Sequence, residues 1–367
     1  MSDFLERINI GRTTDTNKGL LTGLTKFDKF TYNLQKETYT VIGAMKKVGK
    51  TAFLDFRYVL MPYLLNPNAN IKWFYFSFEI SRIKKMAKFA SFLIFYKYGK
   101  LINPSEIMSV GDKKLSDEDY LLVEEVYKKE LVALFGEWNK QGKLIKEGKI
   151  TFIEEKTNPT GIRVTLLDHF YKNGEIMYTD YEIEGAKKKR MTGYRENDPS
   201  LYTIIITDHV GLLKKEQGFN KKDNIDKFSE FMIEMRNTYK ATVIATSQFN
   251  RDLSKIDRLK FSGDQLTPTA EDFKDTGNLA EDATVLITLF NPYAYKHLKK
   301  HLGYELNKLD KKYVSLHLLE SRDTEGFVDL GLNFIGSCGF FKELPYPEDM
   351  TNSIYQKVQS NQFALEQ

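Results

Sequence analysis

The sequence predicts an α/β fold in which a mainly parallel central sheet is flanked by helices, with insertions. Apolar runs of strand length alternate with stretches of helical periodicity, and this alternation is typical of a parallel sheet connected by helices. The run 203–207 is β-branched throughout, as expected of a strand that is buried on both faces. A chain of 367 residues can bury such a core without disulfide bonds, and its length fits one large domain.

The predicted strands are apolar or β-branched runs bounded by turn residues. In chain order they are 38–43, 71–77, 149–153, 202–207, 241–246 and 284–289. Two later runs, 313–319 and 328–334, look like an antiparallel pair around Gly326.

The predicted helices follow from apolar residues at spacings of three and four. The clearest pattern consists of Ile225, Phe228, Met232, Met235 and Tyr239. Further helices are expected at 51–65, 81–98 and 115–135, and a short helix near 3–8.

Three segments do not fit this core. Residues 99–115 form a polar connector, and residues 157–200 read as an insertion that carries the basic run Lys187–Arg190. We expect the polar segment 346–367 to be a mobile tail. The predicted organisation is therefore a linker at 1–17, one α/β domain at 18–345 and the tail.

Composition excludes several classes of protein. Hydrophobic residues make up 41% and charged residues 28%, which rules out collagen-like and disordered chains. The net charge is only +4, so any contact with nucleic acid must come from local basic patches. The chain has one cysteine, Cys338, no signal peptide and no apolar run of about 18 residues. We expect a cytoplasmic protein, in a bacterium or an infected cell, without membrane contact.

A phosphate-binding loop is predicted after the first strand. The segment Ala44-Met-Lys-Lys-Val-Gly-Lys-Thr51 has a small residue, four others, and then Gly-Lys-Thr, with Gly43 just before it. Backbone N–H groups of such a loop and of the following helix form a cradle for phosphate. Lys50 can reach the β- and γ-phosphates, and the Thr51 hydroxyl can bind Mg²⁺. The alternative is a lysine-rich turn without a phosphate-binding role. It is the weaker interpretation, because a predicted strand precedes the segment and a predicted helix follows it. The predicted nucleotide-binding residues are Gly43, Ala44, Met45, Lys46, Lys47, Val48, Gly49, Lys50 and Thr51.

Two acidic residues follow neighbouring predicted strands. Asp208 comes at the end of 202–207 and suits a second ligand of the same Mg²⁺. Glu79 follows 71–77, where a carboxylate can polarise the water that attacks the γ-phosphate. The alternative for Glu79 is an acid placed at a helix N-terminus because the helix dipole favours it.

The motifs in this order resemble the RecA-like ATPase domain of DnaB-type replicative helicases, in a divergent, phage-like version. The resemblance spans roughly 18–342. Besides the phosphate loop, the segments that carry it are Thr22-Gly-Leu-Thr-Lys-Phe-Asp28, Phe76-Ser-Phe-Glu-Ile-Ser81, Ile206-Thr-Asp-His-Val-Gly-Leu-Leu213, Thr246-Ser-Gln-Phe-Asn-Arg251, Glu271-Asp-Phe-Lys-Asp-Thr-Gly277 with Ala280-Glu-Asp-Ala283, and Glu320-Ser-Arg-Asp-Thr-Glu-Gly326.

The resemblance implies roles for individual residues. Glu79 matches the catalytic glutamate, Gln248 the residue that senses the γ-phosphate, and Arg322 the arginine finger supplied to the neighbouring subunit. It also implies ATP and Mg²⁺ as cofactors, single-stranded DNA and a homo-hexamer as partners, and a primase or helicase loader as a further partner. The chain departs from the family at Glu320, where a lysine is usual. Only about 18 residues precede the motor, so we expect the family's N-terminal collar domain to be missing.

Two basic loops are candidates for contact with DNA in the channel of a ring. Both follow strands that carry site residues, and both combine cations with glycine, which suits phosphate contact. Their predicted DNA-binding residues are Lys214, Lys215, Lys221 and Lys222 in the first loop and Arg251, Lys255, Arg258 and Lys260 in the second. Each of the two loops could instead be a solvated polar loop. The run Lys187–Arg190 could touch DNA that flanks the ring, or it could likewise be a solvated loop.

A metal site is not expected at His297 and His301. The two histidines share a face only if that segment is helical, and no third ligand accompanies them.

The leading hypothesis is an ATP-dependent replicative DNA helicase motor that translocates on single-stranded DNA as a ring. Its catalytic residues are Glu79, Lys50, Gln248 and Arg322. Two alternatives stay open. One is a RecA-like recombinase or strand-annealing ATPase, and the other is a non-catalytic loading factor that binds nucleotide as a switch.

Overall fold

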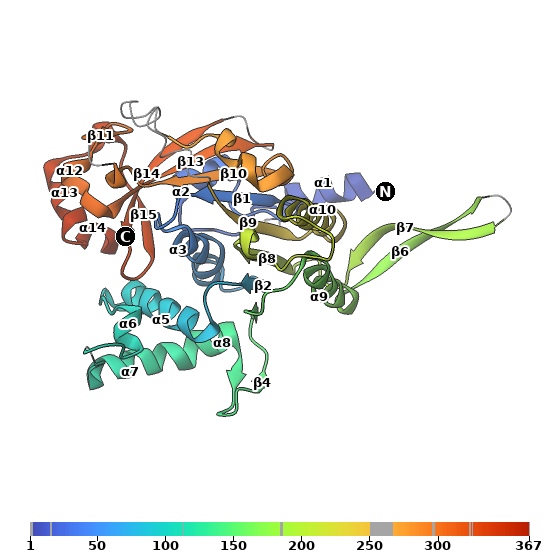
Figure 1. Ribbon diagram of the computed structural model, residues 1–367, viewed down its shortest axis with the longest axis horizontal. Coiled ribbons are helices and arrows are strands. Elements are labelled where there is room, and N and C mark those ends of the chain that lie inside the picture. The colour runs from blue at the N-terminus through green and yellow to red at the C-terminus, as the bar shows by residue number, and fades with distance from the viewer. Residues whose placement is uncertain are drawn as a thin grey trace.

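The computed structural model describes residues 3–14, 17–112, 114–183, 186–249, 267–295, 298–322, 324 and 326–366. At the centre of this part of the chain lies a nine-stranded sheet in the order β15-β14-β13-β10-β1-β9-β8-β2-β5, with helices on both faces (Figure 1).

The six strands from β10 to β5 are parallel, and the three at the other end are antiparallel to their neighbours. The parallel strands are β1 (Tyr39–Ala44), β2 (Ile71–Ser77), β5 (Ile150–Ile153), β8 (Tyr202–Asp208), β9 (Thr242–Gln248) and β10 (Val285–Phe290). The antiparallel strands are β13 (Tyr313–Ser321), β14 (Val328–Ile335) and β15 (Phe340–Glu343). The predicted α/β class and all the predicted strands are confirmed, while β15 was missed.

The helices form two layers because successive residues of a buried strand point to opposite faces. Ile204 and Ile206 pack into the core beneath α5 (Arg82–Tyr98) and the segment that follows β1. Ile205 packs into the other core, beneath α10 (Lys221–Tyr239). The segment after β1 is one continuous helical stretch made of α3 (Lys50–Asp55), η1 (Phe56–Leu60) and α4 (Met61–Leu65).

The remaining short elements surround these layers. Helices are α1 (Asp3–Thr13), α2 (Thr25–Thr31), α6 (Pro104–Ile107), α7 (Asp117–Val126), η2 (Tyr127–Leu131), α8 (Val132–Phe135), η3 (Val210–Leu212), η6 (Ala270–Leu279), η7 (Pro292–Ala294), α12 (Leu306–Leu309), η8 (Asp310–Lys312) and η9 (Pro347–Asp349). Short strand pairs are β3 (Glu137–Trp138) with β4 (Leu144–Lys146) and β11 (Lys300–His301) with β12 (Tyr304–Glu305).

Among its described residues, the predicted connector 99–115 contains one short helix, α6. His301 lies on a strand and not on a helix, so it does not share a helix face with His297. Position 297 itself lies outside the described residues. None of the helices described is long and apolar enough to cross a membrane.

The insertion at 157–200 is an ordered unit rather than a loop. It consists of α9 (Pro159–Lys172) and a long hairpin, β6 (Gly174–Ile183) with β7 (Ala186–Glu196), which projects from the body (Figure 1). The basic run Lys187–Arg190 therefore lies on a strand, which corrects the reading of a solvated loop.

The expectation of a mobile C-terminal tail is wrong. The segment forms α13 (Asn352–Gln359) and α14 (Gln362–Leu365), and Tyr355, Val358 and Phe363 are buried against Tyr304 and Leu309. The polar composition hid an amphipathic pattern, because Tyr355 and Val358 are three residues apart and share one helix face. The other predicted domain boundaries stay predictions.

Candidate active site

The candidate site forms where the parallel strands end. Because parallel strands all present their carboxyl ends at one edge of the sheet, residues that follow different strands come together there. Ala44 at the end of β1 lies beside Gln248 of β9, and Ser77 of β2 lies beside Asp208 of β8. The phosphate loop, Glu79, Asp208 and Gln248 therefore share this edge.

Two glycines shape the phosphate loop for different reasons. Gly49 has a φ of 100°, a left-handed conformation that side chains disfavour, and it caps α3. Gly43 is needed for packing, because a Cβ there would lie 2.3 Å from the rings of Phe249 and Phe273. Ala44, which replaces the usual first glycine, is fully buried as the last residue of β1.

Lys50 begins α3 and is buried at this edge. Its ammonium donates a hydrogen bond to the Ser247 carbonyl at 3.0 Å. Burial lowers the pKa of Lys50 to about 8, although the carboxylates of Asp208 and Glu79 act in the opposite direction. The cation is thus held where a phosphate would approach the loop.

Asp208 is buried and satisfied by two hydroxyls. Thr51 Oγ1 donates to Asp208 Oδ2 and Thr246 Oγ1 donates to Asp208 Oδ1, both at 2.8 Å. Burial favours the protonated form, but the cations Lys85 and Lys50 and these hydrogen bonds outweigh it and lower the pKa of Asp208. An ionised carboxylate beside a threonine hydroxyl is a suitable donor set for Mg²⁺, which prefers oxygen ligands.

Glu79 and Gln248 border the same space. Glu79 is exposed in the bend after β2. Gln248 Nε2 lies 3.3 Å from His209 Nε2, and His209 Nδ1 accepts a hydrogen bond from the Gly211 N–H at 3.2 Å. Burial and the nearby Lys50 cation lower the pKa of His209 to about 4, so the ring is neutral and supports Gln248. Sequence reasoning missed this role, although His209 follows Asp208 directly.

A buried ion pair behind the loop was also missed. Lys85 of α5 is fully buried, and its ammonium donates to both carboxylate oxygens of Asp55 at 2.9 Å and to the Tyr75 hydroxyl at 2.8 Å. The Tyr75 hydroxyl in turn donates to Asp55 at 2.7 Å. The pair ties α5 to α3. Its one sequence signal is an aspartate within a mainly apolar helical run, which also contains Arg57.

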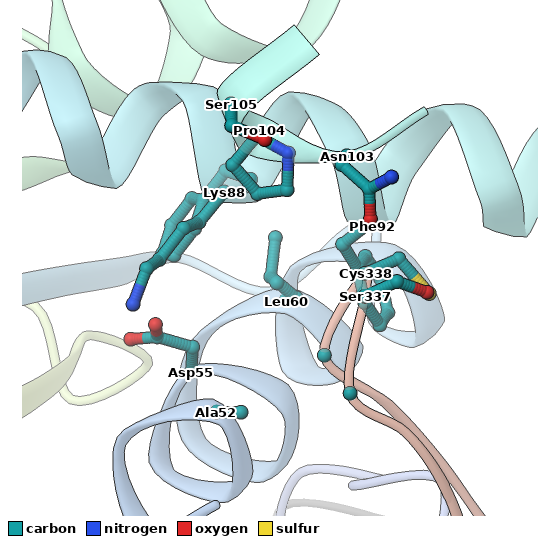
Figure 2. Close-up of a pocket in the computed structure, with 13 residues that line it drawn as sticks. Ala52, Asp55, Leu60, Lys88, Phe92, Asn103, Pro104, Ser105, Ser337 and Cys338 are labelled. Carbon is teal, nitrogen blue, oxygen red and sulfur yellow. The ribbon is translucent and has the colours of Figure 1, made fainter. Parts of the chain in front are cut away.

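A cavity of about 270 Å³ adjoins this pair. It lies between α3, α5 and the turn after β14, and its lining includes Ala52 and Asp55 on one side and Ser337 and Cys338 on another (Figure 2). Figure 2 shows the Lys88 amine pointing toward the Asp55 carboxylate. The cavity thus lies beside α3, the helix that begins at the phosphate loop. Cys338 is buried.

The segment Thr22–Asp28 has a structural role. Thr22 Oγ1 donates to Asp28 Oδ1 at 2.7 Å, and the guanidinium of Arg57 pairs with the same carboxylate at 2.6 Å. All three side chains are buried. The segment therefore anchors the helical stretch that begins with the phosphate loop.

Arg322 does not join the other site residues within one chain. It follows Ser321, which lies opposite Val285 at the start of β10, whereas the phosphate loop follows Ala44, which lies opposite Leu289 near the end of β10. Four residues of strand, about 13 Å, separate these two levels of the sheet. The Arg322 guanidinium donates to the Glu281 carbonyl at 2.6 Å and is exposed at the amino edge.

Comparison with known proteins supports the resemblance to DnaB-type helicases. Residues 175–327 match the family model of the DnaB-like helicase C-terminal domain. The match covers less than half of the chain, and it agrees with the DnaB-type, RecA-like ATPase domain that the resemblance predicts. The chain is an ATP-hydrolysing enzyme of the helicase class. The matched range of the DnaB-like domain includes Asp208, Gln248 and Arg322 and begins after the phosphate loop and Glu79.

Solved structures agree with a DnaB-like fold. One is a DnaB-like replicative helicase described with its interactions with primase, at a TM-score of 0.67 and 17% identity, covering 94% of this chain and 68% of that one. Another is a single ATPase domain, at a TM-score of 0.65 and 16% identity, covering 93% of this chain and 97% of that one. A comparison with curated protein sequences gives no match.

The first candidate DNA loop of this DnaB-type domain is exposed and anchored. Lys214 and Lys215 precede α10, and Lys221 and Lys222 begin it. Glu216 holds the loop by accepting a hydrogen bond from the Thr160 N–H at 2.8 Å. The residues proposed for the second loop, Arg251, Lys255, Arg258 and Lys260, lie outside the described residues.

Proposed function

We propose that the protein is a replicative DNA helicase motor that translocates on single-stranded DNA as a ring and hydrolyses ATP between neighbouring subunits. The position of Arg322 carries this proposal. An arginine exposed at the edge of the sheet opposite its own phosphate loop can reach a nucleotide only in another subunit.

The residues at the carboxyl edge have distinct roles in this proposal. Lys50 and the loop N–H groups bind the phosphates, while Thr51 and Asp208 hold Mg²⁺, which neutralises charge on the phosphates when bound. Glu79 orients and polarises the attacking water. Gln248, supported by His209, senses the γ-phosphate.

Coupling to DNA follows from the loops after β8 and β9. Gln248 ends β9 and the basic loops follow β8 and β9, so a change at the γ-phosphate can be passed to residues such as Lys214 and Lys221. The ring is expected to be a hexamer. Because the similar DnaB-like helicase is described with primase, we propose a primase or a loader as a further partner, in the cytoplasm of a bacterium or an infected cell.

The decisive experiment mixes two inactive variants. Lys50→Ala removes the phosphate-binding cation, and Arg322→Ala removes the group supplied to the neighbour. In a mixed ring, an Arg322→Ala subunit with an intact loop can lie next to a Lys50→Ala subunit with an intact arginine, and that interface is complete. We expect hydrolysis stimulated by single-stranded DNA to reappear on mixing.

The matched control mixes Lys50→Ala with Glu79→Gln. Both changes lie at the same edge, so every interface stays incomplete and hydrolysis stays absent. If the first mixture also stays inactive, the shared site is refuted. Strong hydrolysis without unwinding of a forked substrate would favour the recombinase alternative instead.

A further inference from the structure

The β6–β7 hairpin is anchored at its base and uncovered farther out. At the base Tyr194 is buried, and its hydroxyl donates to the Phe170 carbonyl at 3.0 Å. Farther out, the described side chains at 178–182 and 188–190 are exposed on both strands. An isolated two-stranded ribbon is only marginally stable in water, so a partner that covers this one would stabilise it.

The outer ribbon has two different faces. Residues directly opposite each other on paired strands share a face, and neighbours in sequence alternate. On one face Asp180 lies opposite Lys189, an acid facing a base. On the other face Thr179 lies opposite Arg190 and Tyr181 lies opposite Lys188. Among the described side chains of this second face there are two cations, an aromatic ring and no acid.

This arrangement suits an anionic backbone. Lys188 and Arg190 are two residues apart on one strand, so their side chains leave the ribbon about 7 Å from each other. Contacts of lysine and arginine with phosphates supply most of the sequence-independent affinity of proteins for DNA.

The hairpin lies far from the DNA loops of the proposed ring. It precedes the amino end of β8, whereas the loop with Lys214 follows the carboxyl end. Six residue steps of strand, about 20 Å, separate the two ends, and the hairpin extends away from the body (Figure 1). It therefore lies well away from the Lys214 loop of its own chain.

We propose that the face with Tyr181, Lys188 and Arg190 binds the phosphate backbone of double-stranded DNA outside the ring. A two-stranded ribbon fits the major groove of a duplex, which favours duplex over single strand. Only the location of that duplex, beside a translocating ring, rests on the proposed function.

The test measures binding of the full-length protein to a blunt, fluorescently labelled duplex by anisotropy at several salt concentrations, without nucleotide. The variant is Lys188→Ala with Arg190→Ala. The matched control is Lys187→Ala with Lys189→Ala, which removes two cations from the same strand at register positions opposite Glu182 and Asp180. Thermal unfolding of both checks that the fold is retained.

We expect the first variant to bind duplex more weakly, with a slope of log affinity against log salt reduced by about 2, and the control to stay close to wild type. Equal losses in both variants, or unchanged binding in the first, would overturn the proposal. A loss confined to single-stranded DNA would also overturn it.

Hydrolysis stimulated by single-stranded DNA separates the two proposals. The first variant should retain it, because the hairpin is remote from the phosphate loop. If the wild type itself lacks that stimulation but binds duplex through this face, the motor proposal fails while the hairpin proposal stands.

Discussion

Replacing Lys85 by methionine should strongly destabilise the fold. The substitution roughly keeps the length of the side chain but removes the buried cation. It leaves the Asp55 carboxylate with the Tyr75 hydroxyl as its hydrogen-bond donor and with Lys88, an exposed residue, as the cation nearby. Breaking a buried ion pair by removing one member typically costs about 3–5 kcal/mol, because an uncompensated charge stays behind. We expect a loss in this range in the free energy of unfolding, measured by urea denaturation.

A compensated variant separates lost charge from lost packing. Asp55→Leu with Lys85→Met and Tyr75→Phe removes both charges and the hydroxyl that would otherwise lose its partners. Apolar replacement of a whole buried pair is often neutral or stabilising, so this triple variant should recover most of the loss. If the triple variant is as unstable as Lys85→Met alone, or if the single variant loses less than about 1 kcal/mol, the reasoning is refuted.

The loss should also depend on pH. Burial already raises the pKa of Asp55, and Lys85 opposes that shift. Without Lys85 the pKa of folded Asp55 rises further above its unfolded value, so the variant is least affected at low pH, where Asp55 is protonated in both states. Its destabilisation relative to wild type should grow as pH rises past the ordinary aspartate range. A constant difference between pH 5 and pH 8 would contradict this.

Three further predictions concern the candidate site. Gly49→Ala forces a side chain into a left-handed conformation and should cost about 1–2 kcal/mol in urea denaturation and weaken nucleotide binding. With a pKa of about 8, Lys50 is charged below that pH, so nucleotide affinity measured by a fluorescent ATP analogue should fall as pH rises from 7 to 9. Lys50→Arg should remove this pH dependence. His209→Ala releases Gln248 and should lower kcat by up to about 100-fold with nucleotide affinity nearly unchanged, whereas a change in affinity alone would argue against a positioning role.

Several features of the site could be predicted because they depend on residues that are close in sequence. The strand–loop–helix order around Lys50 is local, and so are the positions of Glu79 and Asp208 at the ends of two strand-like runs. Once the strands are known to be parallel, Asp208 and Gln248 must meet at one edge. This is why the sheet and the strand–loop–helix segment around Lys50 could be predicted.

Other features depend on contacts between distant segments. Asp55 and Lys85 lie on different helices, and neither helix pattern shows that the two charges meet. The C-terminal helices were missed for a similar reason, because the partners of Tyr355 come from residues near 304–309. The hairpin was missed because its strands are mostly polar, with the four consecutive cations Lys187–Arg190 in one of them, so no regular apolar face marks them.

Local patterns in the chain predict most strands of the central sheet, their parallel arrangement and the strand–loop–helix segment around Lys50, since each rests on periodicity or on a contiguous motif. The folded chain alone reveals which charges are buried together, that Arg322 faces away from its own loop, and that the basic run 187–190 stands on a projecting ribbon. These features depend on strand register and direction, which bring residues far apart in the chain to one place and send neighbours in the chain to opposite faces.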